Sequence, residues 1–180
     1  MATGSILTPV VGADRVWSNW QGERILMFER FTEHARHVME LAGREAQRFG
    51  NEYVGTEHLL WGLAKETHGV AATVLEHFHV DLKPLRREME EMLKSRPHVE
   101  DVEKLPQSVH VKEAIQYAVD EARSMHHNYV GTEHILLGLM RNSQAVSAQV
   151  LADFDLDLDA VREEVRRVAE SAGPSEKQQE

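Results

Sequence analysis

One eleven-residue phrase occurs twice in this chain. YVGTEHLLWGL occupies residues 53–63 and YVGTEHILLGL occupies residues 129–139, with two differences between them. A shift of 76 positions aligns residues 32–89 with 108–165 without a gap, and 22 of the 58 aligned pairs are identical. A reaction needs a single site, whereas a structural unit or a binding site can be duplicated. The repeat therefore predicts a domain built from two similar halves.

Each half has the periodicity of α-helices, so the expected fold is all-α. Small and apolar residues recur every three or four positions at the start of each half, which places them on one helix face. Thr32 and Ser108 precede these runs as hydroxyl N-caps, and Gly50 ends the first run where a left-handed residue is favoured. His126 replaces that glycine in the second half, which leaves the geometry there open. The two faces are Ala35, Met39, Ala42, Ala46 and Phe49, and Val111, Ile115, Ala118, Ala122 and Met125; further helices are expected after Gly55-Thr56 and Gly131-Thr132 and at 70–78, 81–95, 146–154 and 157–171.

The halves are separated by a segment with two prolines and several charges, which is typical of a linker. The first 26 residues stand outside the repeat as an N-terminal extension. We expect Trp17 and Trp20 of this extension to pack either on the domain itself or on a partner. The polar composition of the C-terminal tail is typical of disorder. The predicted organisation is an N-terminal extension (1–26), a first repeat (27–95), a linker (96–107), a second repeat (108–170) and a tail (171–180).

Composition excludes several classes of protein. The net charge of −10 with neutral histidine argues against a nucleic-acid partner, because a phosphate backbone needs a basic face. The absence of cysteine excludes disulfides, thiolate chemistry and Cys-based zinc sites. No apolar run approaches the roughly 18–20 residues of a membrane span, and the first residues do not resemble a signal peptide. We therefore expect a soluble, cytoplasmic protein with no membrane partner.

The sequence carries no recognisable catalytic motif. It lacks the phosphate loop G-x-x-x-x-G-K-[ST], the G-x-S-x-G elbow and the zinc motif H-E-x-x-H. Glu76 and His79 form one Glu-x-x-His pair, but a di-iron bundle needs two and the second half lacks the equivalent. We therefore expect no metal, no cofactor and no enzymatic activity. His58 and His134 occupy equivalent positions, and we interpret them as structural hydrogen-bonding residues.

Two carboxylates repeat at the start of a helix. Glu57 and Glu133 follow the Gly-Thr pair, where the helix dipole favours them by only about 0.3–1 kcal/mol. A carboxylate can also hold a guanidinium group through paired hydrogen bonds. Thr32 and Ser108 lie 25 residues upstream, and each opens a helix whose first N–H groups suit a phosphate. The two features together would suit a phosphorylated arginine, although spacing alone does not show that they meet.

These residues carry a resemblance to a known family. MFERFTE, the two YVGTEH phrases and the GVAA-like segments after them are similar, in the same order, to the Clp N-terminal domain. That domain is the paired repeat at the front of ClpC-type unfoldases of the bacterial Clp ATPase family. The resemblance covers residues 27–169. It implies a compact eight-helix domain of two pseudo-symmetric four-helix repeats and a role in protein quality control.

The resemblance also implies partners and binding residues. In ClpC-type proteins this domain docks adaptor proteins and substrates before the ATPase ring unfolds them for a partner peptidase, and some members bind phosphoarginine. The glutamate of each GTEH and the hydroxyl residue opening each first helix form that pocket, which implies the ligand-binding pairs Thr32 with Glu57 and Ser108 with Glu133. The expected partners are protein or peptide substrates, Clp adaptor proteins and a Clp unfoldase or protease.

The sequence departs from the family pattern in several places. The second repeat begins Ser108-Val109 where Thr-Pro is usual, and Ala145 replaces a turn glycine, so the second pocket departs from the family pattern more than the first. We expect no ATP hydrolysis by the family mechanism, because the 180 residues include no ATPase module. The leading hypothesis is a non-catalytic module that recognises substrates or adaptors, with phosphoarginine as one ligand. The alternatives are an interaction protein with vestigial pockets that binds Clp adaptors or modulates a Clp protease, and a histidine-based enzyme or metal protein.

Overall fold

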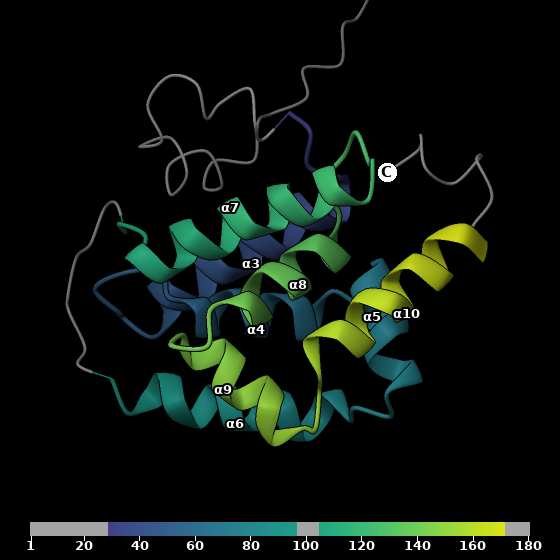
Figure 1. Cartoon of the computed structure of the whole chain (residues 1–180). Coiled ribbons are helices and arrows are strands. Elements are labelled where there is room, and N and C mark those ends of the chain that lie inside the picture. Colours follow the sequence, from purple (N-terminus) through teal and green to yellow (C-terminus); the bar gives the residue numbers. More distant parts are fainter. Residues whose placement is uncertain (1–28, 97–104, 172–180) are drawn as a thin grey trace, which may run out of the picture.

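The computed structural model describes residues 29–96 and 105–171, and this part of the chain is all-α (Figure 1). Apart from two isolated β-bridges, its regular elements are helices, which confirms the expected fold class. The predicted third and fourth helices of each half are confirmed within one residue of their expected ends. The helices are α3 (Glu33–Arg48), α4 (Thr56–Lys65), α5 (Val70–His77), α6 (Leu82–Lys94), α7 (Val109–Ser124), α8 (Thr132–Arg141), α9 (Val146–Asp153) and α10 (Leu158–Ser171).

Side-chain caps start four of these helices, two of them at Thr32 and Ser108 as the sequence predicts. The hydroxyl groups of Thr32 and Ser108 each accept a hydrogen bond, 3.2 Å long, from the backbone N–H three residues further on. Asp81 caps α6 by accepting from the N–H group of Lys83, and Asp157 caps α10 by accepting from that of Ala160, both at 2.9 Å. Each cap satisfies an N–H group that has no partner within the helix.

The first helix of each half ends in the same left-handed turn. Gly50 has φ 60° and His126 has φ 58°, so the histidine adopts the conformation that the sequence left open. The next N–H group in each half bonds back across the turn to a carbonyl at 2.9 Å, as in a Schellman motif. This conformation costs a residue with a Cβ about 1–2 kcal/mol more than it costs glycine.

Helices α4 and α8 form the centre of the domain, between α3 and α7 on one side and α6 and α9 on the other (Figure 1). Nearly all of their residues are buried. The repeated glycines of the phrase allow the closest contacts. A Cβ added at Gly62 would lie 2.6 Å from the carbonyl oxygen of Val38, and one added at Gly138 would lie 2.2 Å from that of Ala114. Both helices therefore pack against the preceding helix, backbone to backbone.

The two halves interlock through their third helices. Helix α5 packs on α8 and α10 of the other half, and α9 packs on both α4 and α8. The N–H group of Ala71 donates to Thr132 Oγ1 at 3.0 Å, and that of Ser147 donates to Thr56 Oγ1 at 3.4 Å. Because α5 follows α4, the start of α8 lies at the end of α4. The starts of α4 and α8 are therefore separated by about the 15 Å length of a ten-residue helix.

The expected linker and the tryptophans are partly described. Leu105 and Gln107 are buried, so the end of the segment predicted as a linker is packed on the fold, whereas residues 97–104 lie outside the described residues. Trp61 is buried and belongs to the core. Trp17 and Trp20 also lie outside the described residues. None of the described helices has the length and apolarity needed to cross a membrane.

Candidate ligand-binding sites at paired helix starts

Each GTEH phrase folds into a helix start that is held by its histidine. The N–H group of Gly55 donates to His58 Nδ1 at 2.9 Å, so the ring proton lies on Nε2, which donates to Asn51 Oδ1 at 2.8 Å. His58 is fully buried, and burial, followed by the charge of Arg96, lowers its pKa from 6.5 to about 3. The structural interpretation of this histidine is confirmed.

The second half builds the same start with one different partner. The N–H group of Gly131 donates to His134 Nδ1 at 2.9 Å, and His134 Nε2 faces His127 Nδ1 at 2.9 Å. His127 thus stands where the first half has Asn51. Burial, with a smaller effect from His127, lowers the pKa of His134 to about 3. Both repeated histidines are therefore neutral at pH 7.

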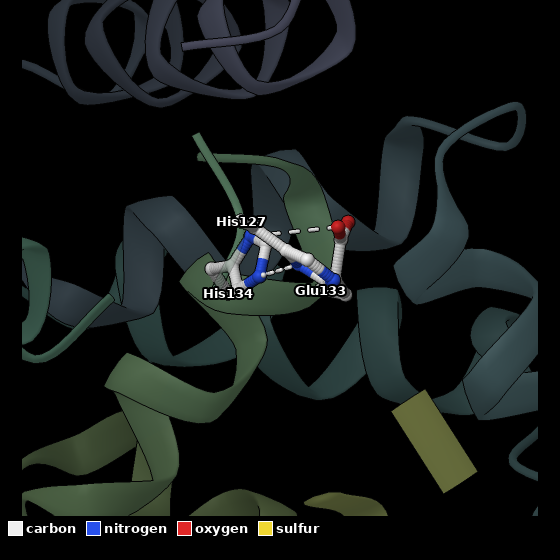
Figure 2. Close-up of side chains that lie close together, drawn as sticks. All are labelled: His127, Glu133 and His134. Carbon is white, nitrogen blue, oxygen red and sulfur yellow. Dashed lines mark hydrogen bonds and ion pairs between the residues drawn. The ribbon is translucent and has the colours of Figure 1, made fainter. Parts of the chain in front are cut away.

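His127, Glu133 and His134 gather closely enough to suggest a metal centre, with ligand atoms within 4.8 Å of one another (Figure 2). The hydrogen bonds argue against one. Because His134 Nδ1 accepts the N–H group of Gly131, its proton lies on Nε2, and a protonated nitrogen has no lone pair for a metal. The cluster therefore has the donor set of a hydrogen-bond chain from backbone through His134 to His127.

The two glutamates fold back over the glycines that precede them. A Cβ added at Gly55 would lie 2.2 Å from Glu57 Oε1, and one added at Gly131 would lie 2.3 Å from Glu133 Oε2. The glycines of the phrase thus make room for the carboxylates. Each glutamate is only 2% exposed. Burial raises the pKa of Glu57, and its own backbone N–H and the charge of Arg96 oppose that rise.

The helix starts come together across the halves. The N–H group of Ser108 donates to the carbonyl of Val54 at 2.9 Å, two residues before the GTEH threonine, and that of Thr32 donates to the carbonyl of Val130 at 3.0 Å. Both contacts belong to short parallel bridges. Ser108 therefore lies beside the start of α4, and Thr32 lies beside the start of α8.

The pairing expected from the sequence is consequently wrong. Glu57 neighbours Ser108 rather than Thr32, and Glu133 neighbours Thr32 rather than Ser108, because each site combines a helix start from both halves. We call these the Glu57 site (Glu57, Ser108 and their helix starts) and the Glu133 site (Glu133, Thr32 and theirs). In each site the starts of two helices lie side by side, and helix N-termini favour an anion, beside a buried carboxylate that favours a cation.

The Glu57 site contains two residues that the sequence did not single out. Arg96 Nη2 lies 2.6 Å from Glu57 Oε1, and Arg96 Nη1 donates to the hydroxyl group of Tyr53 at 2.9 Å. The guanidinium also lies over the Tyr53 ring, 5.3 Å from its centre. Tyr53 repeats as Tyr129 in the phrase, a signal that could have identified it. Arg96 aligns with Ala172, so the repeat gave no such signal.

Two large hydrophobic side chains are exposed at the Glu57 site. Tyr53, in front of α4, and Val109, the first residue of α7, are 37% and 66% exposed. They flank the bridge that joins Val54 to Gln107. A ligand that reached Glu57 would therefore also meet apolar and aromatic surface, a combination typical of peptide recognition.

The fold and its paired helix starts define a two-repeat, all-α domain with pseudo-twofold organisation. The family model of the Clp repeat (R) N-terminal domain matches residues 30–112 and 107–180. The chain therefore belongs to this family, as its residues suggested.

Two curated relatives show how the match is distributed. The chain is 45% identical over 142 residues to the ATP-dependent Clp protease ATP-binding subunit ClpA homolog of Guillardia theta, and the aligned stretch covers 79% of this chain. It is 43% identical over 141 residues to the ClpC subunit of Staphylococcus aureus strain USA300, covering 78% of the chain. The chain spans 17% of the length of each relative.

Solved structures share the fold. The N-terminal domain of the chaperone ClpD from Arabidopsis thaliana matches with a TM-score of 0.63 and 24% identity, over 79% of this chain and 96% of that one. A complex of the ClpV N-domain with a VipB peptide matches with a TM-score of 0.65 and 14% identity, over 79% of this chain and 88% of that one.

Proposed function

We propose that this chain is a non-catalytic recognition module of the Clp quality-control system. It captures protein substrates, peptides or adaptor proteins for a Clp unfoldase or protease, and its ligands include arginine side chains, in particular phosphoarginine. In each site the carboxylate of Glu57 or Glu133 holds the guanidinium group. The N–H groups of the neighbouring helix starts, with Ser108 or Thr32, hold the phosphate. The compartment would be the cytoplasm.

One observation carries most of the proposal: Glu57 already neighbours a guanidinium, 2.6 Å from Arg96 Nη2. The carboxylate is buried beside the starts of α4 and α7, which supports a cationic subsite next to an anionic one. Phosphoarginine carries both charges on one side chain. A carboxylate complements its guanidinium group, and a pair of helix N-termini complements its phosphate.

The relatives support the choice of partners. The matched relatives are ATP-binding subunits of an ATP-dependent Clp protease, and this chain resembles a part that makes up 17% of the length of each. The ClpV N-domain binds a VipB peptide, which gives this fold a precedent for peptide binding. Peptide and protein partners are therefore the class that the proposal names.

Calorimetric titration with a phosphoarginine peptide tests the proposal, with the arginine and phosphoserine forms of the same peptide as controls. Glu57→Gln and Glu133→Gln keep the size of the side chain and remove its charge. Each lost charge-assisted hydrogen bond is worth about 1.5–3 kcal/mol, so each variant should weaken its own site about 10- to 150-fold. Glu45→Gln is the matched control, because Glu45 is equally buried and paired with Arg48 but lies outside both sites.

Unchanged affinity in the Glu57→Gln, Glu133→Gln double variant would refute this mechanism. If the phosphoserine peptide bound as tightly as the phosphoarginine peptide, the carboxylate would not recognise the guanidinium group, and only that part of the mechanism would be refuted. No binding to any form would favour the alternative, an interaction protein with vestigial pockets. The ion pair of Arg96 with Glu57 is the observation that favours this alternative, since it gives the carboxylate a cation from within the chain.

A further inference from the structure

The side chain of Arg96 occupies the Glu57 site in the manner of a ligand. Its guanidinium is contacted by a buried carboxylate, a phenol hydroxyl and an aromatic face, from Glu57 and Tyr53. These are three groups that proteins use to recognise arginine. Arg96 follows helix α6, and its contacts lie 39 and 43 residues earlier in the chain, at the start of α4.

The contact with the carboxylate is close but imperfect. Arg96 Nη2 and Glu57 Oε1 are 2.6 Å apart, yet Oε1 has no aligned hydrogen-bond donor among the described residues. A buried carboxylate oxygen without such a donor is energetically unfavourable. Arg96 itself stays 24% exposed, so water reaches one side of the pair. An arginine that approached with better alignment would satisfy Glu57 more completely than Arg96 does.

We propose that Arg96 is an internal ligand that closes the Glu57 site, and that an external arginine binds there only by displacing it. The inference rests on the proposed function, whose regulation it describes. The residue of the second half that aligns with Arg96 is Ala172, so the repeat does not duplicate this guanidinium.

Displacement has a measurable consequence for affinity. The apparent dissociation constant of a ligand increases by the inverse of the fraction of molecules whose site is open. If minor open states hold about 10% of the population or less, removal of Arg96 should tighten binding at the Glu57 site about tenfold or more. The same change should leave a ligand that avoids Glu57 unaffected.

The test uses the full chain carrying Glu133→Gln as the parent, so that binding is observed at the Glu57 site alone. Arg96→Gln and Arg162→Gln are each added to this parent and compared with it. Arg162 is a close match, because it is 22% exposed and lies 2.9 Å from the buried carboxylate of Glu121, outside both sites. Two probes are titrated at pH 8, because burial raises the pKa of Glu57 and a high pH favours its ionised form. A phosphoarginine peptide is followed by calorimetry, and methylguanidinium is followed through the amide NMR signals of Gly55 and Ser108.

The expected result is binding of both probes at least about tenfold tighter to Arg96→Gln than to the parent, with Arg162→Gln equal to the parent. If methylguanidinium gains affinity but phosphoarginine binds no variant, the internal ligand stands and the proposed function fails. If phosphoarginine binds the parent and Arg96→Gln equally, the proposed function stands and the internal ligand is wrong. If neither probe prefers Arg96→Gln, the inference is also overturned.

Discussion

Acid should unfold this domain through two histidines, His58 and His134. Both are fully buried, and both have a pKa lowered from 6.5 to about 3. A lowered folded-state pKa means that the unfolded chain binds protons more readily than the native one. The stability that depends on the neutral rings is therefore complete above pH 6.5 and is lost as the pH falls toward 3.

The size of the loss follows from the two pKa values. Between pH 7 and pH 5 the unfolded histidine gains about 0.7 of a proton and the folded one gains almost none, and integration over this range removes about 2 kcal/mol for each residue. Two histidines remove about 4 kcal/mol. This is a large part of the roughly 5–15 kcal/mol by which domains of this kind are stable.

Urea unfolding at pH 7 and pH 5, followed by circular dichroism, measures this loss. His58→Gln and His134→Gln remove the titration while keeping an acceptor for the N–H group of the N-cap, as glutamine does at this position of a capping box. Each variant should reduce the loss between the two pH values by about 2 kcal/mol. Burial raises the pKa of Glu57 and so acts in the opposite direction, but that contribution cancels in the comparison.

His68→Gln is the control, because the His68 side chain is 82% exposed. It should leave the pH-dependent loss unchanged. If the parent loses less than about 1 kcal/mol between pH 7 and pH 5, or if both buried variants keep the full loss, then these histidines do not control acid stability and the reasoning is wrong.

Two further substitutions test the packing. Gly138→Ala should lower the free energy of unfolding by about 2 kcal/mol or more, because the new Cβ meets the backbone of Ala114. This loss should exceed the gain from the better helix propensity of alanine. Thermal unfolding measures the change, and equal or higher stability would contradict the close contact of α7 and α8. His127→Asn gives His134 the same kind of partner that His58 has in Asn51, so it should change stability at pH 7 by less than about 0.5 kcal/mol. His127→Ala leaves His134 Nε2 without a partner and should lower stability by about 1–3 kcal/mol. Equal losses in these two variants would exclude the hydrogen-bond chain.

Local patterns predicted the helices because their causes are local. The caps at Thr32 and Ser108, the core faces and the left-handed turn at Gly50 each depend on residues within a few positions of one another. His126 shows the limit of this reasoning, because it adopts a conformation that its residue type disfavours. There the repeated fold around the turn determines the backbone rather than the residue itself.

The sites were only partly predictable, because their causes are not local. The four residues Thr32, Glu57, Ser108 and Glu133 all lie at helix starts, as expected, yet their pairing depends on which half each start meets. That choice is made by two parallel bridges and the exchanged third helices, between residues 53 or more positions apart. A sequence aligned with itself shows that two units are equivalent but not how they dock.

The duplicated phrase can now be divided into what the fold needs and what it does not. Gly62 and Gly138 allow the helix contacts, and the histidines hold the helix starts. A glutamate is not required for either task, since burial raises the pKa of Glu57 and a buried carboxylate opposes folding unless a cation compensates it. The repeated glutamate is thus the residue for which a binding role gives the simplest physical reason, which supports the proposal that the chain duplicates a site as well as a structural unit.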